Sequence, residues 1–319
     1  MTDSLCQPNN TGLMVKNLVV IDKVKDINSI EEIGNIFFEI LDYFKPLIKI
    51  PRNATIVIKV NLCLLIGPET GGTVDPLVAK LLCRWFLEHY DIEKIYLAEA
   101  DATHLDADMA FKVLGWENLT DEMEKVSFLN LTKDAQVNVQ PEGATYLKRL
   151  NMSKSLMNAD LLVSLAKLKT HTKQKITCIM KNQFGSISHK YKITYHPRLA
   201  EAICDATAAR IPDLCIVDGL IAMEGNGPTN GFPRSTKLLL ASNDPVSMDH
   251  FCARLMGFKP MSIPHLRLGV RRELGSIDYK IFGNPPNPLN LRFKFVPKWK
   301  TVAKKCIGLM QRGAINEET

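Results

Sequence analysis

The sequence predicts an α/β fold in which a mainly parallel sheet is flanked by helices. Two observations support this prediction. Short apolar runs rich in β-branched residues alternate with longer segments of helical spacing, and several helical segments begin at recognisable caps. Such alternation is typical of parallel strands whose crossover helices cover both faces of a sheet. With 319 residues, the chain is long enough to bury a large core.

Six apolar runs are predicted to form β-strands. They are rich in Val, Ile and Leu, as expected for strands that are buried on both faces. In chain order they are Asn17–Ile21, Thr55–Val60, Lys94–Ala98, Leu161–Leu165, Leu214–Val217 and Lys237–Ala241.

Four helices are predicted between or after these strands. Two of them follow an Asp-Pro pair, Asp75-Pro76 and Asp244-Pro245, in which the carboxylate caps the first turn and Pro takes the first helical position. A third helix is predicted to end at Gly115, because glycine readily takes the backbone conformation that stops a helix. The four helices are Pro76–Tyr90, Ala107–Leu114, a segment from Pro197 to about Arg210, and Pro245–Met256.

We expect two closely coupled lobes that share a cleft. Residues 16–215 are predicted to form the main α/β lobe and residues 216–285 a second α/β lobe. A polar segment, residues 1–15, precedes them, and a basic tail, residues 286–319, follows them.

The predicted tail holds most of the net charge of +6, because it carries seven basic and two acidic residues. Phe293, Phe295 and Trp299 alternate with these basic residues, a pattern that suits weak contact with an anionic membrane surface or an acidic partner. A solvated tail is one alternative. Packing of the aromatic rings onto the body, where they would cover an edge strand, is another.

Composition argues against several other classes of protein. The body carries almost no net charge, so we expect no nucleic-acid partner. No apolar run approaches the ~20 residues that span a bilayer, and the polar N-terminus lacks the apolar core of a secretion signal. The eight cysteines are scattered without any C-x-x-C pair, as expected for reduced and mostly buried thiols. We therefore expect a soluble, cytoplasmic protein that is not transmembrane.

Polar residues gather where the predicted strands end, which is where open parallel sheets place their functional groups. Lys59 and Asn61 end the second strand, and we interpret them, together with Asn182, as substrate-binding residues. His104 follows the third strand and is a candidate acid or base. A solvated loop or a helix cap is the alternative for each of these residues.

The strongest local signal is the stretch from Lys167 to His196. Lys167 and Lys169 are two residues apart, so in a continuing strand both ammonium groups lie on one face and could hold a carboxylate or a phosphate. A solvated basic turn is the alternative, since Lys173 and Lys175 follow.

Two further residues of this stretch offer proton transfer or covalent chemistry. His171 is of a type that exchanges protons near neutral pH. Lys181 follows the apolar run Cys178-Ile-Met, so partial desolvation would lower its pKa towards a nucleophilic or cofactor-attaching role. Neutralisation of a nearby Asp is the alternative for Lys181.

Four residues are candidate ligands for a divalent metal. Carboxylate oxygens suit a hard cation, and imidazole is a common ligand. Asp218 and Glu224 belong to a glycine-rich segment that is predicted to be a loop, and this loop matches neither a phosphate-binding loop nor a dinucleotide fingerprint. A tight connection without a ligand explains the loop equally well. The candidate ligands are His196, Asp218, Glu224 and Asp249.

These elements resemble the family known as domain of unknown function 362, from about Lys59 to Gly283. The motifs that carry the resemblance are Lys59-x-Asn61, Lys167-x-Lys169-x-His171, Lys181-Asn182-x-x-Gly185, His196, Asp218-Gly219 to Gly227-Pro228, and Ser242-Asn-Asp244-Pro245 with Asp249. Many members carry a ferredoxin-like cysteine module. This chain lacks the grouped cysteines that such a module needs, so we expect no iron–sulfur cluster in it.

A weaker resemblance, in order and spacing, links the chain to the lactate racemase family. The Ala100 to His104 turn is followed by a helix, and His171, Lys181 and His196 then fall in an order similar to that family's catalytic histidine, cofactor-bearing lysine and metal-binding histidine. The glycine-rich run that precedes the lysine in that family is replaced here by Gln174 to Met180. The resemblance therefore does not carry over a nickel pincer cofactor.

Together these features favour an enzyme that binds a small anionic substrate, a carboxylate or a phosphate, and transfers a proton or a hydride. His104, His171 and Lys181 are the catalytic candidates. The cofactor is unknown, and a divalent metal is one option. The alternative is a noncatalytic accessory protein that holds an anion or a cofactor at the same residues.

Overall fold

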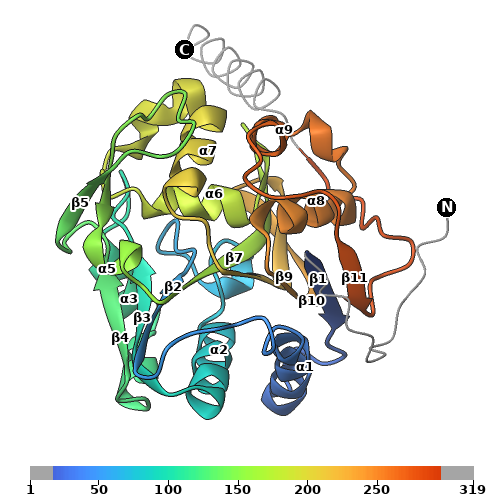
Figure 1. Cartoon of the computed structure of the whole chain (residues 1–319). Helices are drawn as coiled ribbons and strands as arrows, with labels where there is room; N and C mark the ends of the chain where they lie inside the picture. Colours follow the sequence, from blue (N-terminus) through green and yellow to red (C-terminus); the bar gives the residue numbers. More distant parts are fainter. Residues whose placement is uncertain (1–16, 296–319) are drawn as a thin grey trace, which may run out of the picture.

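The computed structural model describes residues 17–295, which contain a nine-stranded sheet with helices on both of its faces (Figure 1). The strands are β1 (Leu18–Lys23), β2 (Ala54–Lys59), β3 (Ile92–Glu99), β4 (Val126–Asn130), β7 (Leu161–His171), β8 (Lys175–Thr177), β9 (Leu214–Asn226), β10 (Asn230–Ser242) and β11 (Lys280–Gly283). Two further strands, β5 (Gln136–Val139) and β6 (Leu150–Ser153), form a separate ribbon.

The helices are α1 (Ile30–Asp42), α2 (Pro76–His89), α3 (Ala107–Val113), α4 (Glu117–Asp121), α5 (Lys154–Met157), α6 (Ile179–Gln183), α7 (Leu199–Ala209), α8 (Pro245–Met256) and α9 (Pro264–Arg271). Short 3-10 helices lie at Pro68–Thr70, Phe184–Ser186, Lys192–Arg198 and Pro260–Ser262.

The strand order is β11-β1-β10-β9-β7-β2-β3-β4, and the central part of the sheet is parallel. Parallel pairing joins β9 to β7, β7 to β2, β2 to β3 and β3 to β4. Antiparallel pairing joins β10 to its neighbours β9 and β1. The predicted α/β class with a mainly parallel sheet is therefore confirmed.

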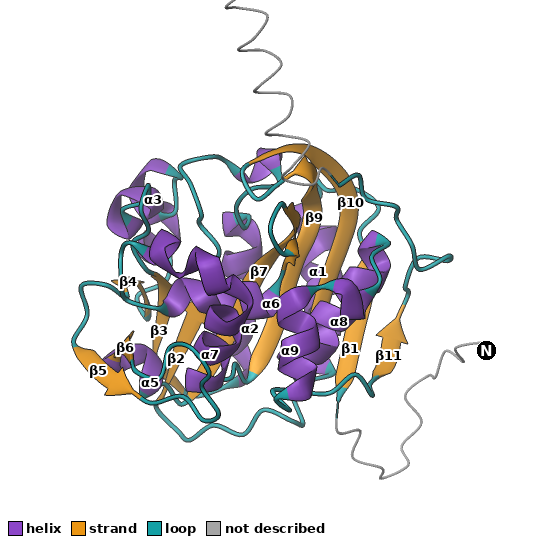
Figure 2. Cartoon of the chain, turned by 90° about the horizontal axis from the view of Figure 1, so that it is seen from above, coloured by secondary structure: helices purple, strands orange, loops and turns teal. Residues whose placement is uncertain are grey.

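Each face of the sheet has its own hydrophobic core, because successive side chains of a strand point to opposite faces. In β2, Ile56 and Ile58 pack with the side chains of α1 and α2, whereas Val57 belongs to the core on the other face. Residues of α6, α7, α8 and α9 fill that second core. Figure 2 shows α7, α8 and α9 lying across one face of the strands.

The predicted helix caps are present. Asp75 accepts a hydrogen bond from the backbone N–H of Leu77, and Asp244 accepts one from Ser247. Helix α8 spans the predicted residues and ends at Gly257, which has a φ of 89°. Helix α2 ends one residue before the predicted boundary.

The glycine-rich segment is not a loop, contrary to the expectation from its composition. Strand β9 continues through Asp218 and Glu224 to Asn226, and a short turn leads into β10. The two strands exchange backbone hydrogen bonds along most of their length, and this pairing holds the segment in an extended form. The expected boundary between two lobes, after residue 215, falls inside β9, and strands from both expected lobes join the same sheet. The two-lobe division stays a prediction.

The first part of the predicted tail packs against the body. Phe293 is buried, its backbone N–H donates to Met256, and the backbone N–H of Gly225 donates to Lys294. Phe295 contacts the ring of Phe258 edge-on. The rest of the tail with Trp299, and the polar segment 1–15, lie outside the described residues. Between residues 17 and 295, no helix is both long and apolar enough to cross a membrane.

A buried carboxylate fastens α7 to two neighbouring segments. Asp205 is fully buried and accepts hydrogen bonds from the backbone N–H groups of Tyr146 and Leu147. The guanidinium of Arg272 lies 2.6 Å from the other carboxylate oxygen. Glu201, on the same helix, pairs with Arg198 at the surface instead.

We expect Asp205→Ala to lower the free energy of unfolding by about 3 kcal/mol or more, because it leaves the guanidinium and three backbone amides, those of residues 145 to 147, without their buried partner. Glu201→Ala is the matched control on the same helix, and its effect should stay within about 0.5 kcal/mol because exposed ion pairs contribute little. Urea unfolding followed by circular dichroism measures both values. Equal effects of the two variants would contradict this account of Asp205.

Candidate functional site

The candidate site lies where the strand order reverses. From β2 the chain proceeds to β3 and β4 on one side, whereas β7, β9 and β10 are added on the other side. At such a switch point, the loops that leave the carboxyl ends of neighbouring strands diverge and leave room for a ligand. Lys59 ends β2, and Lys169 lies near the end of β7. The two lysines therefore flank the switch point.

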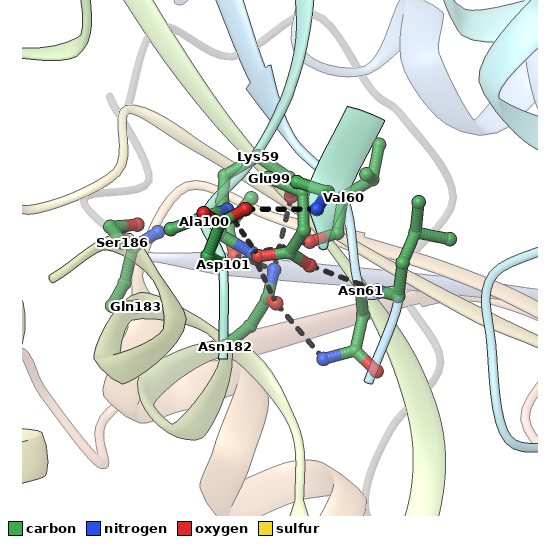
Figure 3. A network of polar contacts seen from close by, with 12 residues as sticks. Lys59, Val60, Asn61, Glu99, Ala100, Asp101, Asn182, Gln183 and Ser186 are labelled. Carbon is green, nitrogen blue, oxygen red and sulfur yellow. Dashed lines mark hydrogen bonds and ion pairs between the residues drawn. The ribbon is translucent and has the colours of Figure 1, made fainter. Parts of the chain in front are cut away.

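Lys59 is fully buried and forms an ion pair with Glu99, which ends β3 (Figure 3). The Nζ to Oε1 distance is 2.6 Å. Glu99 also accepts hydrogen bonds from the backbone N–H groups of Leu62 and Ala100. Burial lowers the pKa of Lys59, and Glu99 counteracts part of that effect. Gly185 gives the ammonium room, since a Cβ at that position would lie 3.1 Å from Nζ.

Asn182, on α6, holds this pair in place. Its Nδ2 donates to the backbone oxygen of Lys59 over 3.0 Å and to the hydroxyl of Ser164 over 3.1 Å. Its Oδ1 accepts from Asn61 over 3.0 Å, as Figure 3 shows. The Oδ1 of Asn61 has no hydrogen-bond partner within the described structure, although it is buried. Asn61 and Asn182, both predicted as substrate-binding residues, thus contact each other.

Lys167 has a partner inside the protein. Lys167 and Lys169 lie on the same face of β7, as their spacing predicted, but Lys167 pairs with Asp218 of the neighbouring strand at 2.8 Å. Both side chains are buried. Asp218 also accepts hydrogen bonds from the backbone N–H groups of Asp75 and Leu220. These contacts join β7, β9 and the start of α2.

Lys169 and Lys181 carry the positive charge that is left over. Lys169 is buried, and its Nζ bonds to the backbone oxygen of Gly72 and to the sulfur of Cys63. Lys181 is partly exposed, and its Nζ lies 4.5 Å from the centre of the Phe184 ring. Among residues 17–295, neither ammonium has a carboxylate within ion-pair distance.

Although the side chain of Lys181 is partly exposed, the protein atoms around its ammonium desolvate it and lower its pKa to about 8, and the positive charge of Lys169 adds to this effect. Lys192, whose Nζ donates to the backbone oxygen of Asp101, has its pKa lowered to about 8 by burial as well. A lysine whose pKa is near 8 exists in both protonation states around neutral pH. Lys181 can therefore hold an anion when charged and accept a proton when neutral.

His171 is held in one orientation at the end of β7. Its Nδ1 accepts hydrogen bonds from the backbone N–H groups of Lys173 and Gln174, at 3.2 and 3.3 Å. This pattern assigns the proton of the neutral ring to Nε2. Burial lowers the pKa of His171 well below its usual range, and the charges of Lys181 and His196 lower it further. His171 is therefore a neutral hydrogen-bond donor at pH 7.

The four residues predicted as metal ligands are not brought together. Asp218 pairs with Lys167, Glu224 with Arg234 at 2.7 Å, and Asp249 lies 3.4 Å from the buried ring of His265. His196 lies instead near Phe184, with 6.4 Å between their rings. Within residues 17–295, no three His, Cys, Asp or Glu side chains are grouped so that they could hold a metal ion.

His104 lies in an exposed turn after β3, between the bridge partners Ala102 and Leu105. Glu99 follows the third predicted strand, so its position made it a candidate at this edge of the sheet, but the sequence assigned it no role. Lys192 and Cys63 were not predicted as site residues. Neither Lys192 nor Cys63 belongs to a recognisable motif. The folding of the segments that contain them brings Cys63 to Lys169 and Lys192 to Asp101.

The fold and the site define a class: an α/β protein with a cluster of lysines at the switch point of a mainly parallel sheet. The family model described as domain of unknown function 362 matches residues 56–254, so the chain belongs to this family. The match includes β2, β3, β7 and α6, which carry Lys59, Glu99, Lys169 and Lys181.

Two further similarities accompany the family match. The thylakoid-associated protein sll1697 of Synechocystis sp. is 34% identical over 143 residues, which are 41% of this chain and 44% of that protein. The matched part is thus less than half of that relative's length. The solved lactate racemase apoprotein of Thermoanaerobacterium thermosaccharolyticum is 13% identical, with a TM-score of 0.38, over 70% of this chain and 55% of that one.

We expect Lys167→Met to lower the free energy of unfolding by roughly 3–5 kcal/mol, because it leaves the buried carboxylate of Asp218 without a cation. Lys181→Met should change it by less than about 1 kcal/mol, since the methionine keeps the contact with Phe184 and removes no ion pair. Chemical denaturation of both variants and of the wild type measures the difference. A larger loss for Lys181→Met than for Lys167→Met would reverse the roles given to the two lysines.

Proposed function

We propose that the protein is an enzyme that binds a small carboxylate or phosphate through Lys169 and Lys181 and transfers a proton. The observation that carries this proposal is the pair of ammonium groups at the switch point, which have no carboxylate partner among the described residues. An anionic ligand would supply the missing negative charge.

Lys181 is the group that we assign to proton transfer. Its pKa of about 8 leaves a fraction of neutral amine at neutral pH, and a base is most effective when its pKa is close to the working pH. Binding of the anion raises the pKa of a nearby lysine, because negative charge favours the ammonium form. The ligand itself would then strengthen the base that removes its proton.

His171 complements Lys181 as a donor. With the proton on Nε2 and no positive charge at pH 7, its ring can donate a hydrogen bond to a ligand oxygen on which negative charge develops. A preoriented donor costs little reorganisation during the reaction. The sequence left both proton transfer and hydride transfer open. We favour proton transfer, because Lys181 and His171 carry the groups that accept and donate a proton.

A noncatalytic anion-binding protein is the second candidate. It is favoured by Lys169, which is buried, makes hydrogen bonds to Gly72 and Cys63, and needs no change of protonation state to bind an anion. Both candidates predict anion binding. Only the enzyme predicts turnover that depends on the neutral form of Lys181.

Proton transfer is tested without knowledge of the substrate by hydrogen–deuterium exchange in D2O. The protein is incubated with a panel of small carboxylates and phosphates that carry a C–H bond next to a carbonyl or carboxyl group, and the loss of each proton signal is followed by NMR. We expect at least one compound to exchange. Its rate at saturating concentration should rise with pH and level off above the pKa of Lys181 in the complex, which the bound anion raises above the value of about 8 in the free protein.

Lys181→Met should abolish this exchange while the protein stays folded. Glu201→Ala is the matched control. Glu201 is partly exposed, pairs with Arg198 and has no role in the proposed site, so this variant should leave the rate unchanged. If no compound of the panel exchanges faster than the buffer control although anions bind, the noncatalytic candidate replaces the enzyme.

A further inference from the structure

The proposed function leaves Cys63 unused, although this residue lies within the lysine cluster. Cys63 belongs to the β2–α2 loop, residues 60–75, and its side chain is partly exposed. The Nζ of Lys169 donates a hydrogen bond to its sulfur over 3.0 Å. This contact places a positive charge beside the sulfur, the atom through which a cysteine acts as a nucleophile.

The sulfur makes two weaker contacts as well. The sulfur lies 3.5 Å from the backbone oxygen of Gly72 and 3.9 Å from that of Pro228, and both are acceptors for a neutral thiol. Hydrogen bonds that involve a charged group are about twice as strong as neutral ones, and the Lys169 contact is also the shortest of the three. The ammonium therefore dominates the surroundings of the sulfur.

A second, independent feature at the same place is the hydroxyl of Thr177. Thr177 is directly opposite Lys169 in the pairing of β7 with β8, so the two side chains point to the same face of the ribbon. Its Oγ1 is buried and has no hydrogen-bond partner within the described structure, and the residue is only 3% exposed. A buried hydroxyl without a partner indicates a place where a ligand atom can bind.

The other described cysteines differ from Cys63. Cys83, Cys178, Cys204, Cys215 and Cys252 are all buried, whereas Cys63 is partly exposed. Burial raises the pKa of both Cys83 and Cys204 to about 12, which keeps these thiols protonated and unreactive. Among residues 17–295, reactivity is therefore expected at Cys63.

We propose that Cys63 is a nucleophile that forms a covalent adduct with a ligand carrying both an anionic group and an electrophilic carbonyl carbon, such as a small 2-oxo carboxylate. This inference rests on the proposed function, because Lys169 and Lys181 hold the anionic group. The thiolate sulfur forms a bond to the carbonyl carbon as the π bond of the carbonyl breaks. The electron pair passes to the oxygen, which takes a proton from the Lys181 ammonium. The product is a hemithioacetal or a hemithioketal, and no oxidant or reductant is consumed.

The test compares two alkylating reagents of similar size on the full chain. Iodoacetate is anionic and iodoacetamide is neutral; with either, a carbon–sulfur bond forms, the carbon–iodine bond breaks and iodide leaves. Peptide mapping by mass spectrometry reads the Cys63 peptide separately from those of the other cysteines. Relative to a free thiol in solution, we expect Cys63 to favour iodoacetate over iodoacetamide by about tenfold, because the lysines attract the anion.

Two competitors separate anion binding from covalent chemistry. Sulfate should slow iodoacetate more than iodoacetamide, because it occupies the lysines and leaves the sulfur free. Glyoxylate, an anion with an electrophilic carbonyl, should slow both reagents, because it also occupies the sulfur. In Lys169→Met, the preference for iodoacetate should fall towards that of the free thiol, because only Lys181 of the two lysines remains. The competition in the wild type tests the proposal independently if this variant does not fold.

The inference is overturned if Cys63 shows the same preference as the free thiol, or if glyoxylate protects against iodoacetamide no better than sulfate does. Either result leaves the proposed function standing as long as sulfate binds to the wild type. If sulfate does not bind to the wild type, the proposed function itself is wrong.

Discussion

Burial of lysine ammonium groups at the carboxyl ends of β2 and β7 is the constraint on which the rest of the site depends. Each buried charge carries a desolvation penalty of several kcal/mol unless an opposite charge or hydrogen bonds offset it. For two of the lysines, an ion pair with a carboxylate offsets this penalty: Lys59 pairs with Glu99, and Lys167 pairs with Asp218. Lys169 and Lys181 have no such partner among the described residues. A bound anion would neutralise the positive charge of these two lysines, which we call the surplus charge.

The topology of the sheet makes this arrangement possible. Lys59 contacts Asn182 of α6 and lies beside Gly185 of the 3-10 helix that follows, whereas Lys169 contacts the β2–α2 loop. That loop approaches β9 closely. Gly71 has a φ of 72°, and a Cβ there would lie 2.2 Å from the backbone oxygen of Ala222, so only glycine fits without rearrangement. Because the loop lies this close to β9, Gly72 and Cys63 are within hydrogen-bond distance of the Lys169 ammonium.

Local signals in the sequence predicted the elements that they control directly. Helix α8 has the predicted bounds. Asp244 and Pro245 marked its start in the sequence, and the cap and the proline act locally without any tertiary contact. Lys169 and His171 were predicted as site residues because they follow an apolar strand, and Lys181 because it follows a short apolar run. Arg234 lies only 10 positions from Glu224, but the two meet through the pairing of β9 with β10, in a segment that the sequence predicted to be a loop. Asp249 meets His265 of the next helix through the packing of α8 with α9. The partner of Asp218 was not predictable, since Lys167 lies 51 positions away on another strand. Cys63 was missed for the same reason: 106 positions separate it from Lys169.

The most direct test of the surplus charge is calorimetric titration of the wild type with sulfate, whose charge is constant between pH 7 and pH 9. We expect tighter binding at pH 7, because Lys181 is mostly charged below its pKa of about 8 and mostly neutral above it. Lys181→Met should reduce this dependence on pH, and Lys169→Met should weaken binding at both pH values. Equal affinities at pH 7 and pH 9, or the absence of binding at low ionic strength, would contradict the account.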